Sequence, residues 1–271
     1  MTKLGLALAG LATAALLTGC GGSDDGGSNA DGGSTSSGGA SGGASGGASG
    51  GASSGAASSA SGGFAAESGQ QIADSAKSDM GRLDSLRVAG TVTTSGDRIT
   101  IDLQMDADGN CTGSLSTTQG KVELLGADGK TWMKPDAAFW KGMTGAQADR
   151  VIQIVGDKWV VVPSTEKSFS QFCDADQLIK ELVSDDTSGT TYTKTGSTTV
   201  DGQDVVTVDS KDPGGQTSTG YVLVADPHYL VKVEQRDGTE PGTVTFSDFD
   251  ADVQTEAPAE GDTIDFSKLI G

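Results

Sequence analysis

The sequence has little basic charge and only one histidine. Lys and Arg number 18 against 37 Asp and Glu, and the formal net charge of the 271 residues is −19. A surface dominated by negative charge repels nucleic acid and gives no electrostatic attraction to anionic lipid. Nucleic acid is therefore excluded as a partner.

The patterns that mark common catalytic and cofactor sites are absent from the sequence. There is no Gly-x-Ser-x-Gly elbow, Walker loop, Rossmann fingerprint or metal-ligand cluster. His228 follows Asp226-Pro227 in a predicted turn, where we expect it to be exposed to solvent. Asp106–Asn110 lacks the later ligands of a calcium loop, so a β-turn is expected there. We predict a protein that is not an enzyme and binds no metal or cofactor.

No hydrophobic run is long enough to span a membrane. Residues 4–17 are apolar and follow Lys3, which suits the central region of a secretory signal. Leu17-Thr18-Gly19-Cys20 comes next and resembles the lipobox of bacterial lipoproteins. That resemblance implies removal of residues 1–19 and lipidation of Cys20. The protein is then expected at the outer face of the cell membrane, held by its acyl chains.

Residues 20–63 contain no apolar side chain large enough to form a core. Residues 21–63 include 17 Gly and 13 Ser, with tandem Gly-Gly-Ala-Ser units at 38–53. Such a composition favours a flexible coil, here a tether of about 33–39 Å root-mean-square span. The folded domain is therefore expected within residues 64–271.

The domain sequence predicts an α+β fold. Residues 67–84 carry apolar positions at helical spacing, and Ile99–Met105 alternates strictly between apolar and polar residues. About ten or eleven strands are expected in all, mostly joined by short loops that favour antiparallel pairing. A helical insert is expected around 136–184. Eleven predicted strands lie at 86–92, 99–105, 111–117, 120–126, 130–134, 190–195, 198–201, 204–209, 219–225, 229–236 and 242–249, and a further strand at 158–162 lies within the insert.

Two cysteines remain after Cys20. Exported domains usually join such a pair, so a Cys111–Cys173 disulfide is expected, closing a loop of about 63 residues. The alternative is two separate thiols. A metal site is disfavoured because no histidine lies nearby.

Several local strings together resemble a known family. Gly109–Gly113, Trp132–Trp140, Phe172-Cys173-Asp174 and Ile264-Asp265-Phe266 follow the lipobox and tether. The order of elements is similar to that of actinobacterial lipoproteins of the LppX/LprG group, which share the half-open barrel of LolA/LolB carriers. The resemblance implies a strongly curved antiparallel sheet, helices in its mouth, and binding of lipids or acylated molecules.

The sequence leaves two functions open. The first is a monomeric carrier that holds a lipid-like ligand in the concave face, and the second is a cell-surface interaction lipoprotein with a filled core. An aromatic content of 5% and polar residues along several strands argue against a large lipid cavity and allow a filled core. The predicted ligand-binding residues are Ile101, Leu103, Met105, Leu124, Trp132, Phe139, Trp140 and Trp159.

Overall fold

The computed structural model describes residues 61–266 except 95, 164–170, 184–188 and 239. The predicted signal, Cys20 and nearly all of the predicted tether lie outside the described residues. Within the described part, no helix is long and apolar enough to cross a membrane.

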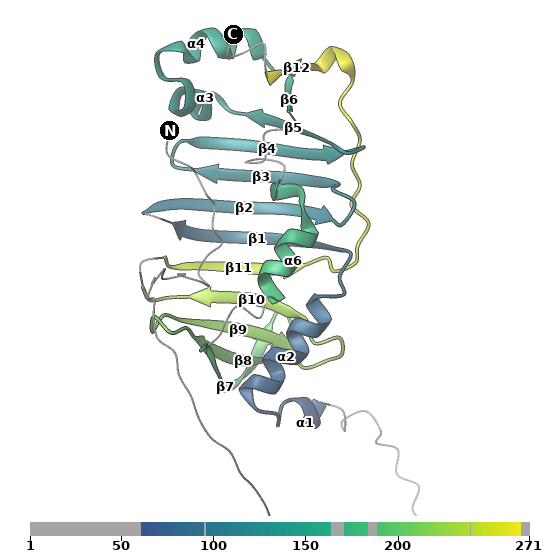
Figure 1. The fold of residues 1–271 in the computed structure, drawn as a ribbon, viewed down its shortest axis with the longest axis vertical. Helices are drawn as coiled ribbons and strands as arrows, with labels where there is room; N and C mark the ends of the chain where they lie inside the picture. Colours follow the sequence, from purple (N-terminus) through teal and green to yellow (C-terminus); the bar gives the residue numbers. More distant parts are fainter. Residues whose placement is uncertain (1–60, 95, 164–170, 184–188, 239, 267–271) are drawn as a thin grey trace, which may run out of the picture.

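One sheet of twelve strands forms the body of the molecule (Figure 1). Its order is β12-β6-β5-β4-β3-β2-β1-β11-β10-β9-β8-β7, and every pair is antiparallel except β12 with β6. The strands are β1 (Ser85–Thr94), β2 (Asp97–Asp106), β3 (Cys111–Thr117), β4 (Gly120–Ala127), β5 (Lys130–Pro135), β6 (Trp159–Val162), β7 (Thr191–Val200), β8 (Gln203–Lys211), β9 (Thr217–Leu223), β10 (Leu230–Gln235), β11 (Gly242–Ser247) and β12 (Thr263–Asp265).

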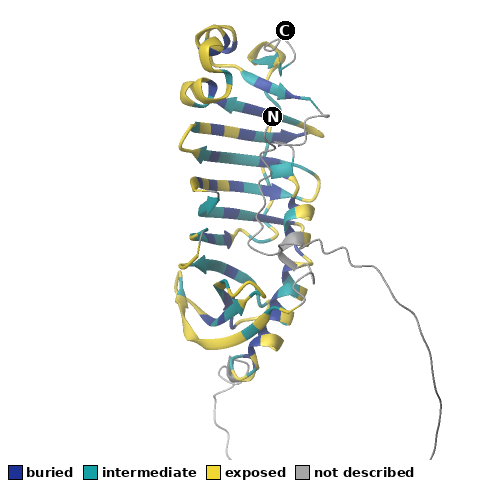
Figure 2. Cartoon of the chain, turned by 60° about the vertical axis from the view of Figure 1, so that its left-hand side comes forward, coloured by how far each residue is buried: buried dark blue, intermediate teal, exposed yellow. Residues whose placement is uncertain are grey.

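The sheet is open and curved. Its edge strands, β12 and β7, lie at opposite ends, and the β7 end curls round as a partly closed barrel (Figure 2). This confirms the predicted α+β half-open barrel. The two predicted strands at 190–195 and 198–201 form one strand, β7, because a bulge between Lys194 and Gly196 shifts the register without ending the pairing.

Five α-helices lie within the described residues, and two of them cross one face of the sheet. They are α1 (Ser61–Phe64), α2 (Gly69–Met80), α3 (Ala137–Thr144), α4 (Ala148–Val155) and α6 (Ala175–Val183). We call the face that carries α2 and α6 the inner face and the opposite one the outer face (Figure 1). The α3–α4 pair lies at the β12–β6–β5 end.

Local sequence explains where the helices begin. Ser68 and Gln71 form a capping box at the start of α2. Asp136 caps α3 by accepting a 2.7 Å hydrogen bond from the backbone N–H of Phe139. Helix α2 ends at Met80, short of the predicted 84, because Gly81 closes it with a backbone bond to the Lys77 carbonyl.

The core is divided between three clusters. The largest joins the inner side chains of β1–β6 and β11 to α3, α4 and α6. A second lies under α2, where Ile72 and Ala76 pack against Val206, Val208 and Val222. A third contains Val205, Tyr221, Leu223 and Val231, and the register of β8 and β9 places it on the outer face.

Candidate ligand-binding face

The inner face of β1–β5 is a continuous apolar surface. In β2, Ile99, Ile101, Leu103 and Met105 all point to this face, and each is at most 7% exposed. The next strands continue it, since Leu124 of β4 is paired with Met133 of β5, and Met133 with Val160 of β6. Four of the predicted ligand-binding residues, Ile101, Leu103, Met105 and Leu124, therefore share one surface.

Two predicted site residues lie on the other face of the sheet. Trp132 is buried, but its register partners are Leu125 and Val161, so it points away from Leu124 and Met133. Trp159 precedes the inward-facing Val160, and its ring lies 5.8 Å from the ammonium nitrogen of Lys134. Because side chains alternate along a strand, the register separates these two tryptophans from the inner set.

Phe139 and Trp140 lie on α3 beside the edge of this surface. Trp140 is 3% exposed and belongs to the main core, whereas Phe139 is half-buried. Their rings meet edge to face at 6.3 Å. Gly120 lets the start of β4 lie directly against α3, because a Cβ at this position would lie 2.2 Å from the backbone nitrogen of Phe139.

Helix α6 covers the inner face and is covalently fastened to it. Cys111 at the start of β3 forms the predicted disulfide with Cys173, two residues before α6. Asp174 then caps the helix by accepting a 2.9 Å hydrogen bond from the backbone N–H of Gln177. Ala175 and Ile179 point into the main core. The disulfide thus fixes the N-terminal end of α6 above β3.

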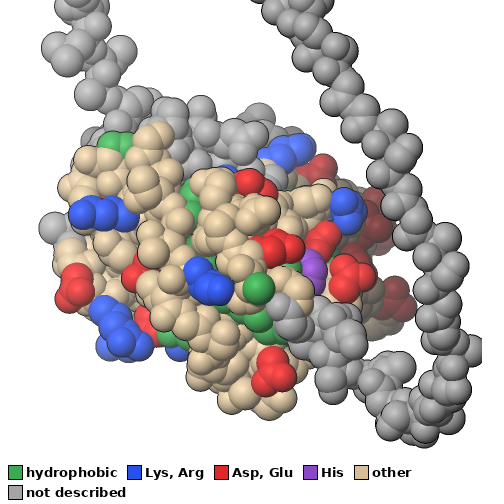
Figure 3. Space-filling model, turned by 90° about the horizontal axis from the view of Figure 1, so that it is seen from below, with side chains coloured by type: hydrophobic (Ala, Val, Ile, Leu, Met, Phe, Trp, Pro, Cys, Tyr) green, Lys and Arg blue, Asp and Glu red, His purple; other side chains and the backbone are tan. Residues whose placement is uncertain are grey.

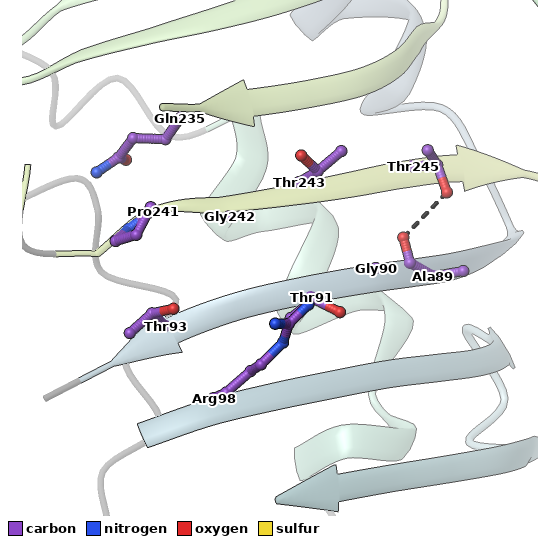
Figure 4. Close-up of a pocket in the computed structure, with 10 residues that line it drawn as sticks. All are labelled: Ala89, Gly90, Thr91, Thr93, Arg98, Gln235, Pro241, Gly242, Thr243 and Thr245. Carbon is purple, nitrogen blue, oxygen red and sulfur yellow. Dashed lines mark hydrogen bonds between the residues drawn. The ribbon is translucent and has the colours of Figure 1, made fainter. Parts of the chain in front are cut away.

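Among the described residues, hollows open near or on the outer face in two places that concern the predicted site. One, of about 380 Å³, lies between the β4–β5 end and α3–α4, with Trp140, Ile152 and Pro135 in its wall and Lys121 and Lys134 beside them. The other, of about 640 Å³, is a wide polar hollow over β1 and β11 (Figure 4). There the Thr245 hydroxyl donates a 2.9 Å hydrogen bond to the Ala89 carbonyl. Neither hollow could be predicted from sequence, since both depend on how strands and helices meet.

A charged cluster lies on the outer face of β9 and β10. Hydrogen bonds from Arg236 and Tyr221 lower the pKa of Glu234 to about 2, and nearby Lys232 acts in the same direction. Burial, with a smaller effect from Glu234, raises the pKa of Tyr221. All the charged members of the cluster are paired, so we interpret it as a strand-to-strand brace.

His228 is not the exposed loop residue that the sequence predicts. It is half-buried, its ring stacks on Phe64 with 3.6 Å between centroids, and its Nδ1 lies 3.1 Å from the Leu223 carbonyl oxygen. Its backbone N–H donates to Asp79 of α2 at 2.8 Å. Figure 3 shows this end of the molecule, where acidic and basic side chains are interspersed at the surface. His228 joins α1 and α2 to the β9–β10 turn.

The acidic turn at 106–110 is held by hydrogen bonds to the carboxylate of Asp106. Asp106 accepts hydrogen bonds from the backbone N–H groups of Asp108 and Asn110 and from the Asn110 side chain. This is the turn that the sequence predicts. Within the described part of the chain, no group of three or more His, Cys, Asp or Glu side chains is placed to hold a metal ion.

Comparison with solved structures defines the class of fold. No family model and no curated protein matches the sequence. LprF from Mycobacterium bovis is 18% identical, with 70% of this chain and 97% of LprF covered and a TM-score of 0.50. The Mycobacterium tuberculosis lipoprotein LppX is 15% identical, with 69% and 98% covered and a TM-score of 0.45.

At these sequence identities, the similarity to LprF and LppX extends to the fold alone. The chain has the curved-sheet fold predicted from its resemblance to the LppX/LprG group. More particularly, the fold is similar to that of LprF, which is matched over nearly the whole of its structure.

Proposed function

We propose that the protein is a membrane-anchored extracytoplasmic lipoprotein that holds a lipid-like ligand between the inner face of β1–β5 and helix α6. The observation that carries the proposal is the apolar inner face of β1–β5, which α6 crosses (Figure 1). Burying a ligand chain there stabilises the complex by about 0.8 kcal/mol per methylene. The groups that would bind it are the inner side chains, including Ile101, Leu103, Met105 and Leu124.

Ligand entry requires α6 to move. The inner side chains of β2 and β4 are buried, in part by Ala175 and Ile179 of α6. The disulfide holds one end of the helix, so α6 would swing about Cys173 while its other end leaves the sheet.

A second function is favoured by the same burial. If α6 never leaves the sheet, the inner face is a filled core, and the protein acts as a cell-surface interaction lipoprotein through its acidic exterior. Organic extraction of protein purified from its native host separates the two functions. A carrier releases a lipid in an amount comparable to the protein, whereas a protein with a filled core releases none.

The anchor gives a prediction of its own. Cys20→Ala removes the sulfur that would carry the lipid, so the variant is expected in the medium or in an uncleaved form, whereas the wild type stays with the membrane. Fractionation followed by immunoblotting measures this. Ser23→Ala, three residues away, serves as the matched control and should stay with the membrane. Membrane retention of a cleaved Cys20→Ala protein would contradict the anchor.

A further inference from the structure

The polar hollow of about 640 Å³ over β1 and β11 lies on the outer face, opposite the proposed lipid site (Figure 4). Its volume is within the range of small-ligand sites in proteins. The register of the strands explains its shape, since Thr91 is paired with Thr243 and Ala89 with Thr245. These small side chains form the floor of the hollow, and longer side chains from β2 and β10 stand at its sides.

Hydroxyl groups dominate the surface of the hollow, and several of them are available to a ligand. The Thr91 hydroxyl lies 3.2 Å from the hydroxyl of Thr100. The hydroxyls of Thr93 and Thr243 have no hydrogen-bond partner within the described part of the chain. Because a hydroxyl both donates and accepts hydrogen bonds, the hollow matches a ligand that itself offers both roles at several positions.

Arg98 is the charged residue among the ten that line the hollow. Its side chain extends from β2 across to Thr91 of β1 (Figure 4). The nearby Arg87 is held by Asp102 through two hydrogen bonds of 2.8 and 3.0 Å. Arg98, in contrast, forms no ion pair or hydrogen bond with any other described residue. Its guanidinium is therefore available to an anionic group of a ligand.

The acidic residues around the hollow limit how strongly it attracts an anion. The carboxylate of Asp97 accepts a hydrogen bond from the β3–β4 turn, on the side of β2 away from the hollow. Glu234 of β10 accepts a 3.0 Å hydrogen bond from Arg236. Glu240 precedes Pro241 at the rim and offsets part of the charge of Arg98. A small anion is therefore held weakly, and the best match is a ligand that combines an anionic group with several hydroxyls.

We propose that this hollow binds an acidic saccharide, that is, a sugar chain that carries carboxylate or phosphate groups. Arg98 would bind an anionic group, while the hydroxyls of Thr93 and Thr243 and the amide of Gln235 would bond to sugar hydroxyls. Adjacent strands lie about 4.8 Å apart and alternate residues of one strand about 6.7 Å apart, so these groups are spread widely enough to contact successive sugar rings. The hollow and α6 lie on opposite faces of the sheet, so the inference does not depend on the proposed function.

Nuclear magnetic resonance of threonine methyl groups tests the saccharide site, because four threonines line it. Residues 20–271 carrying Cys20→Ser are labelled with ¹³C at these methyl groups and titrated into the millimolar range with trigalacturonate. Maltotriose is the uncharged trisaccharide for comparison. The signals of Thr91, Thr93, Thr243 and Thr245, each assigned by replacement with Ser, are expected to shift, and trigalacturonate is expected to bind more tightly than maltotriose.

Two substitutions test the roles of the side chains. Arg98→Gln removes the charge and keeps a polar side chain, so it should weaken trigalacturonate binding about tenfold and leave maltotriose binding nearly unchanged. Thr243→Val removes a hydroxyl at nearly constant shape and should weaken the binding of both sugars about fivefold. Arg150→Gln and Thr198→Val make the same changes at exposed positions elsewhere and should have no effect.

A parallel titration with glucose 6-phosphate distinguishes a phosphate group from a carboxylate group, and tighter binding of either acidic sugar than of maltotriose supports the proposal. Inorganic phosphate tests whether the hollow binds anions alone. Shifts of the same methyl signals with phosphate but with none of the sugars would overturn the saccharide site. Equal affinity of Arg98→Gln and the parent for trigalacturonate, or shifts confined to threonines outside the hollow, would also overturn it.

Discussion

Gly113→Ala is expected to lower the free energy of unfolding by more than about 3 kcal/mol. Gly113 lies in β3 between Leu103 and Leu124 in register, on the apolar inner face, with a φ of +145°. A Cβ there would lie 2.0 Å from the backbone oxygen of Asp102 and 2.8 Å from the Cα of Leu103. Because both atoms belong to the backbone of β2, the added methyl group has to force β2 and β3 apart at the Leu103–Gly113 pair.

Gly109→Ala is the matched control for this substitution. Gly109 also has a positive φ, +84°, but a Cβ there has nothing within 4 Å. Gly109→Ala should therefore lower the free energy of unfolding only through the unfavourable backbone conformation of the new alanine, by about 1–2 kcal/mol. Urea denaturation of both variants measures the difference. Equal losses of stability would show that β2 and β3 are not in the close contact described here.

Removal of the disulfide is expected to have the second large effect. The bond joins residues 62 apart in sequence, and the chain-entropy model gives about 4 kcal/mol for a loop of that size. The double variant Cys111→Ala with Cys173→Ala avoids leaving a lone thiol. Since both cysteines are buried in the main core, the loss of side-chain contacts adds to the loss of the cross-link.

The disulfide variant should also weaken the protection of α6 against hydrogen exchange more than that of the rest of the domain. Without the bond, the helix keeps its core contacts, its contacts with α2 and the Asp174 cap, but it loses its covalent link to β3. Hydrogen exchange is therefore expected to accelerate in Ala175–Val183 before it does in β8 or β9, which lie under α2. Unchanged stability together with unchanged exchange in α6 would contradict the conclusion that the disulfide holds the N-terminal end of α6 against the sheet.

The sequence predicts features that depend on local pattern. Strict alternation in Ile99–Met105 predicts both β2 and the face that its side chains share. The compartment and the cysteine count predict Cys111–Cys173, which the structure contains. The family resemblance predicts the curved half-open sheet.

Other features depend on pairing between distant segments, which a local pattern does not contain. The face on which Trp132 lies is set by the register of β5 with β4 and β6, so the sequence alone could not place it. Strand β12 pairs in parallel with β6 across about a hundred residues of chain. His228 is half-buried because Phe64 of α1 and Asp79 of α2 contact it at the β9–β10 turn. The arrangement of α3 against α4 likewise depends on packing between the two helices.

Native mass spectrometry of the lipidated protein from its native host tests the carrier function most directly. The same preparation measured under denaturing conditions gives the mass of the polypeptide with its covalent lipid, so any difference is ligand held without a covalent bond. The account predicts an additional mass in the range of a single lipid, carried by a substantial fraction of the molecules and lost after extraction with organic solvent. Identical masses under native and denaturing conditions would contradict it and would leave the inner face as a filled core.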